Sequence, residues 1–143
     1  MSNDRAVNYQ QEVPGILKSM AGVNEAIAGH GLDGTLYHLV QLRASQINRC
    51  GFCVEMHTTD ARRDGETSER LDRVIVWDQV NNFSDREKAA LAWTEALTVL
   101  DPKADLGALR VRLREHFSEK EIGALTAAVA MINLWNRISI SNH

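Results

Sequence analysis

Apolar residues recur along most of the chain at intervals of three and four, the spacing that places side chains on one face of an α-helix. Strict alternation of polar and apolar residues, which is typical of a half-buried strand, is almost absent. Pro14 suits the first turn of a helix, and glycines at 29, 31 and 34 punctuate its end. With the cap residues, the pattern predicts helices over roughly residues 14–28, 34–47, 50–64, 68–75, 85–100, 106–113 and 119–135.

Two of these helices have strong start signals. Capping boxes stand at Ser84 to Glu87 and at Ser118 to Glu121. The segment 74–77 could also pass for a short buried strand, but no second strand is available to pair with it. We therefore predict an all-α bundle of about six to seven helices in one domain over residues 1–143, with the polar residues 1–12 loosely held.

Composition narrows the functional classes. The chain has 143 residues, 44 % of them hydrophobic and 24 % charged, and a net charge of −3. This balance offers no basic stripe for nucleic acid and no polybasic patch or apolar run for a membrane. The first residues lack the apolar segment of a signal peptide. We expect a cytoplasmic protein with neither a nucleic-acid nor a membrane partner.

The chain's two cysteines, Cys50 and Cys53, are separated by two residues, and His57 follows four residues later. On a helix these three side chains share one face. Cysteines three apart on a helix lie roughly 5 Å apart, within disulfide range. The helix N-terminus and a neighbouring imidazole both favour a thiolate. The spacing therefore predicts redox chemistry, with Cys53 as the attacking thiolate, Cys50 as the resolving thiol and His57 as the base.

Other interpretations of the pair compete. The cysteines could be unreactive and buried, or they could bind zinc with His57 and with His38 or His30. A structural zinc site usually takes its second ligand pair from a second knuckle, and none is visible. Covalent haem needs a histidine directly after the second cysteine, where Val54 stands. A thioredoxin-type fold needs a βαβ pattern that the chain lacks.

The string Ser45-Gln-Ile-Asn-Arg-Cys-Gly-Phe-Cys53, followed by His57, resembles the AhpD-like alkylhydroperoxidases of the carboxymuconolactone decarboxylase superfamily. The similarity extends over most of the chain from about residue 30 and includes residues 60–62, 89–95 and 133–137. The resemblance implies an all-helical fold, assembly as a homotrimer or homohexamer, and thiol-dependent peroxidase activity. It implies a peroxide substrate and a thiol or dithiol reductant, without metal, haem or flavin cofactor.

The same resemblance implies a peroxidatic Cys53, a resolving Cys50 and a proton relay through His57. The peroxidases usually carry a glutamate twelve residues before the first cysteine, and here His38 occupies that position. An imidazole brings no negative charge to stabilise an imidazolium at His57, so we expect a weaker or pH-shifted relay. Glu95 is a candidate substitute carboxylate. The alternative function is a non-catalytic thiol redox sensor or stress-associated binding module. A lactone decarboxylase is a weaker alternative, because the decarboxylases lack the cysteine pair.

Several other residues have two interpretations. Arg43 could favour a thiolate or pair with an acid on a neighbouring helix. Asn48 is expected to cap the cysteine helix. The three tryptophans are expected to pack in the core or an interface rather than line an entry channel; they are Trp77, Trp93 and Trp135.

Overall fold

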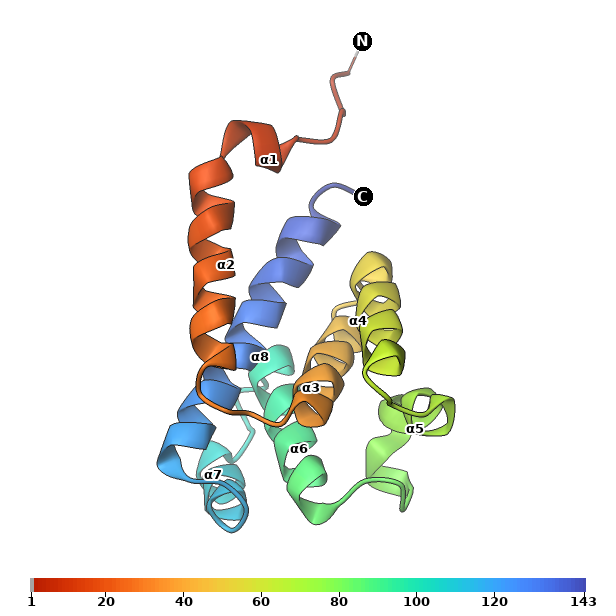
Figure 1. Ribbon diagram of the computed structural model, residues 1–143, viewed down its shortest axis with the longest axis vertical. Coiled ribbons are helices and arrows are strands. Elements are labelled where there is room, and N and C mark those ends of the chain that lie inside the picture. Colours follow the sequence, from red (N-terminus) through yellow and green to blue (C-terminus); the bar gives the residue numbers. More distant parts are fainter. Residues whose placement is uncertain (1) are drawn as a thin grey trace.

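A computed structural model describes residues 2–143 of the protein. Within this range there are eight α-helices, one 3-10 helix and no strand (Figure 1). The elements are α1 (Tyr9–Glu12), α2 (Pro14–Ala28), α3 (Gly34–Ile47), α4 (Gly51–Arg63), α5 (Ser68–Arg73), η1 (Val74–Gln79), α6 (Asp85–Val99), α7 (Leu106–Arg114) and α8 (Glu119–Ile140). The prediction of an all-α bundle is confirmed.

The helix starts follow the caps read from the sequence. Ser84 and Ser118 form complete capping boxes with Glu87 and Glu121, so α6 and α8 each begin at the predicted residue. Asp33 accepts a hydrogen bond from the Thr35 amide at the start of α3. These local bonds satisfy backbone donors that would otherwise lack partners in the first turn of each helix.

Two details differ from the sequence-based expectations. Val74–Gln79 is neither strand nor α-helix but a kinked 3-10 segment that buries Val74 and Trp77. The N-terminal segment, expected to be loose, contains α1 and is bonded to the other end of the chain. The Asn142 side chain exchanges two hydrogen bonds with the Val7 backbone, and the Tyr9 hydroxyl lies 2.7 Å from the Ser141 hydroxyl. Contacts over more than 130 residues have no local signature.

The central element is α3, which contacts α4, α6, α8 and η1. Its two buried faces serve two apolar clusters. One contains Leu36 and Val40 with residues of α6, α7 and α8. The other contains Leu39 and Leu42 with residues of α4, α5, η1 and α6. Burial of these side chains fixes α4 against α3, and α4 carries the cysteine pair.

In Figure 1, α2 runs beside α8 along one side of the molecule, and α4 lies on the far side of α3. Both termini lie at the end of the molecule where α1 folds over. This arrangement leaves a space bordered by α2, α4 and α8.

Candidate active site

The connection from α3 to α4 is held by a network of buried amides. The Asn48 amide nitrogen donates to the side-chain oxygens of Asn133 and Asn136, both at 2.9 Å, and Asn136 donates to the Ser45 hydroxyl. Asn48 is the C-cap of α3, so the expectation that it caps the cysteine helix is wrong. The reason is that Arg49 takes a left-handed conformation (φ 56°), which places Cys50 at the cap position of α4.

Cys50 and Cys53 form a disulfide across the first turn of α4. Their Cα atoms are 5.2 Å apart, in agreement with the distance expected for a helical pair. The Cys53 amide also donates to the Cys50 sulfur. Both residues are buried, and both lie at the positive end of the α4 dipole, which favours a thiolate when the pair is reduced.

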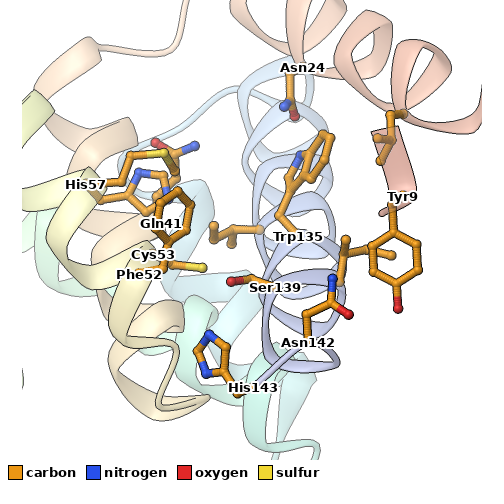
Figure 2. Close-up of a pocket in the computed structure, with 14 residues that line it drawn as sticks. Tyr9, Asn24, Gln41, Phe52, Cys53, His57, Trp135, Ser139, Asn142 and His143 are labelled. Atoms are coloured by element: carbon orange, nitrogen blue, oxygen red, sulfur yellow. The ribbon is translucent and has the colours of Figure 1, made fainter. Parts of the chain in front are cut away.

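A cavity of about 680 Å³ opens beside the disulfide. Cys53 and His57 line it, whereas Cys50 does not. Figure 2 shows Cys53, Phe52 and His57 from α4 on one side and Trp135 from α8 on the other. The lining is mainly apolar and also includes Tyr9, Leu17, Asn24, Gln41, Met56, Ile132, Ile138, Ser139, Asn142 and His143. A small organic molecule in this cavity would meet the sulfur of Cys53, not that of Cys50.

His57 is buried in the wall of the cavity and is only 6 % exposed. Burial lowers its pKa from 6.5 to about 4; the negative charge of Asp60 opposes this shift and the nearby His38 adds to it. Its Nε2 atom is buried without a hydrogen-bond partner. At neutral pH this imidazole is therefore uncharged, as a proton acceptor next to a thiol must be.

His38 lies on α3, outside the cavity lining, and its Nε2 atom is 2.7 Å from Oδ2 of Asp64 at the end of α4. Its Nδ1 atom is buried without a partner. Hydrogen bonds from His38 and Arg63 lower the pKa of Asp64, so this carboxyl group is ionised at neutral pH. Position 38 therefore has a histidine in place of the expected glutamate, but this histidine contacts a carboxylate that belongs to Asp64.

Glu95, the carboxylate suggested by the sequence, has other partners. It accepts hydrogen bonds from Arg43 at 2.9 Å and from the indole of Trp77 at 2.7 Å. Arg43 therefore pairs with an acid on α6, which is one of the two roles expected for it. Of the tryptophans, Trp77 and Trp93 belong to the buried clusters, and Trp135 lines the cavity.

Outside this site, the described residues form no second cluster of histidine and cysteine side chains. His30 bonds through Nδ1 to the Ala26 carbonyl. Over residues 2–143, the structure brings together no group of three or more histidine, cysteine, aspartate and glutamate side chains able to hold a metal ion. No helix in the same range combines the length and apolar character needed to cross a membrane.

The sequence pointed to Cys50, Cys53, His57 and His38 but not to Asp64. A signal for Asp64 was present, because it follows His57 by seven residues, or two turns, and so lies on the same face of α4. The cavity-lining residues of α8 could not be found this way. Their contact with α4 depends on how the two helices pack.

Comparison with known proteins adds a family assignment. Residues 14–96 match the model of the carboxymuconolactone decarboxylase family. The chain is 36 % identical to the uncharacterized protein YdfG of Bacillus subtilis over 94 % of this chain and 92 % of that one. It is 35 % identical to the alkyl hydroperoxide reductase AhpD of Hyphomonas neptunium, over 46 % of this chain and 37 % of the relative.

Solved structures of other proteins have the same fold. A protein of unknown function from Agrobacterium tumefaciens, proposed to be an antioxidant defence protein AhpD, superposes with a TM-score of 0.90 at 34 % identity. This superposition covers 96 % of this chain and 94 % of the other. The debrominase Bmp8 shares the fold at a TM-score of 0.81 and 17 % identity, over 92 % of this chain and 70 % of the enzyme.

Proposed function

The chain belongs to the carboxymuconolactone decarboxylase family, and from this starting point we propose that it is a thiol-dependent peroxidase of the alkyl hydroperoxide reductase type. The observation that carries the proposal is that Cys53 and His57 line the same cavity, while Cys50, bonded to Cys53, does not line it. The proposed reacting sulfur, base and resolving sulfur lie within two helix turns of one another at the start of α4.

In the proposed reaction, neutral His57 takes the proton of the reduced Cys53 thiol. The thiolate attacks one oxygen of the hydroperoxide, the O–O bond breaks, and the leaving alkoxide takes the proton from His57. Cys53 is now a sulfenic acid and the product is an alcohol. The Cys50 thiol displaces water from it and forms the disulfide, which two thiol equivalents of the reductant reduce again.

The cavity supports an organic substrate. Phe52, Met56 and Ile132 give it apolar walls, and a group the size of an alkyl or aryl hydroperoxide fits within about 680 Å³. Trp135 adds an aromatic ring to these walls. We therefore expect a preference for organic hydroperoxides over hydrogen peroxide.

Peroxide consumption with a dithiol reductant tests the proposal. Wild-type protein should exceed the rate of the dithiol alone, and Cys53→Ser should lose this excess. In Cys50→Ser, a sulfenic-acid probe should label position 53, because the resolving thiol is gone. The double variant C50S/C53S is the control for labelling at other residues.

Two results would contradict the assignment. Sulfenic acid at position 50 in Cys53→Ser, together with none at position 53 in Cys50→Ser, would reverse the roles of the two sulfurs. A wild-type rate no higher than that of free dithiol at the same pH would favour the alternative function of a thiol redox sensor. Assembly as a homotrimer or homohexamer is part of the proposal and is tested separately in the Discussion.

A further inference from the structure

We propose that Asp64 is a positioning residue which, through its hydrogen bond to His38, supplies the negative end of the proton relay that serves His57 and Cys53. The inference rests on the proposed peroxidase function and extends it to a residue on the last turn of α4. It assigns to the pair of His38 and Asp64 the task that a single glutamate would perform at position 38.

The first step of the argument concerns which atom of His38 carries the proton. Asp64 is ionised at neutral pH, so its oxygens can only accept hydrogen bonds. The short contact of 2.7 Å with His38 therefore requires Nε2 of the imidazole to donate. In a neutral ring, Nδ1 is then the atom with the free lone pair, and it is the atom that is buried without a partner.

The second step concerns the other partners of Asp64. Its other oxygen, Oδ1, accepts from Arg63 at 3.3 Å. Its backbone amide bonds to carbonyl oxygens of α4, and Gly65 follows in the left-handed region at φ 100°. Each carboxylate oxygen therefore has its own donor in the protein, while 50 % of the Asp64 side chain stays exposed to solvent.

The third step connects the pair to the cysteines. His57 and Asp64 are separated by two turns on one face of α4, or about 10 Å along the helix axis. His38 bonds to Asp64 and lies close enough to His57 to affect its charge. Both His57 Nε2 and His38 Nδ1 are buried without partners. The charge on His38 therefore acts on His57, and Asp64 is the carboxylate in contact with His38.

The charged groups on the elements packed against α3 have partners of their own or are exposed. On α4, Asp64 contacts His38 and also bonds to Arg63, Asp60 bonds to Arg63, and His57 is buried. Glu95 of α6 is held by Arg43, Arg137 of α8 bonds to Asn133, and Asp78 of η1 is exposed. Asp64 is the carboxylate in direct contact with His38.

The main experiment measures kcat/KM for an organic hydroperoxide as a function of pH. Asp64→Asn should lower kcat/KM roughly tenfold, a part of what a positioned acid–base group contributes. Asp64→Glu should recover most of the activity. The matched control is Asp72→Asn, the same change at an exposed position on α5, which should leave the profile unchanged.

A double-variant cycle shows whether Asp64 acts through His38. If it does, Asp64→Asn should have little further effect in a His38→Gln background. Equal losses in both backgrounds, or a wild-type profile for Asp64→Asn, would overturn the proposal.

A second measurement does not depend on turnover. Nitrogen-15 chemical shifts of the oxidised wild-type protein should show the Nε2–H tautomer at His38, and Asp64→Asn should lose this preference. An Nδ1–H tautomer in the wild type would overturn the assignment. If the tautomer is as expected but peroxide is consumed no faster than by free dithiol, the proposed function fails and the pairing of His38 with Asp64 stands.

Discussion

At the scale of single residues, the charge state of His57 links its role as a base to the stability of the folded chain. Its pKa is about 4 in the fold and 6.5 ordinarily. At pH values between 4 and 6.5, the His57 side chain binds a proton in the unfolded chain but not in the folded protein. The contribution of His57 to the free energy of unfolding should therefore be fully present above pH 6.5 and should be lost as the pH drops towards 4. The loss attributable to His57 is up to about 3 kcal/mol.

Chemical denaturation of the oxidised protein at pH 7, 6, 5 and 4 measures this effect. His57→Asn should show a shallower decline than wild type across that window, because the group that resists protonation is gone. His30→Asn, which removes an exposed imidazole, should keep the wild-type slope. Parallel curves for wild type and His57→Asn would show that burial does not hold this imidazole neutral.

At the scale of elements, the join between α3 and α4 depends on Asn136 of α8, which is fully buried. Asn136→Ala leaves the Asn48 amide with one acceptor instead of two and removes the donor to Ser45. An unsatisfied buried polar group costs about 1–3 kcal/mol, and the lost side-chain volume adds to this. We expect the free energy of unfolding to fall by about 2–4 kcal/mol in denaturant titrations. Lys120→Ala, exposed on the same helix, should stay within about 0.5 kcal/mol of wild type.

At the end of α6, glycine substitutions at two adjacent residues should change the free energy of unfolding in opposite directions. Leu100 caps the helix in a left-handed conformation (φ 57°) and is 65 % exposed. Leu100→Gly should raise the free energy of unfolding by about 0.5–1 kcal/mol, because glycine adopts this conformation without strain. Val99→Gly, one residue earlier and 61 % exposed, should lower it by a similar amount, because that residue is helical. The same sign for both would show that strain at Leu100 is negligible.

The sequence was most informative about elements whose signals are local. The capping boxes at Ser84 and Ser118 and the spacing of Cys50, Cys53 and His57 each act within one or two helix turns, and the structure has them as predicted. The contact of His38 with Asp64 joins two helices, and the hydrogen bonds between Val7 and Asn142 join the two ends of the chain. Their formation depends on packing, which periodicity does not encode.

At the scale of the whole molecule, an apolar groove runs between α2 and α8. Ile16, Val23 and Leu134 expose 58 %, 44 % and 37 % of their surface there, and Met131 lies beside them. Side chains of this kind on two adjacent helices make an apolar surface that a monomer would leave in water. We expect this groove to be the contact between copies in the proposed homotrimer or homohexamer.

Light scattering coupled to size-exclusion chromatography tests this assembly. Wild type should have a mass three or six times the 16.0 kDa of one chain. The double variant I16E/L134E places two carboxylates in the groove, where burial against a second copy would require desolvation of both charges. It should therefore run as a monomer. Val111→Glu, a change at a 62 % exposed position on α7, should keep the wild-type mass. A monomeric wild type would contradict the assembly, and an oligomeric I16E/L134E would place the contact on another surface.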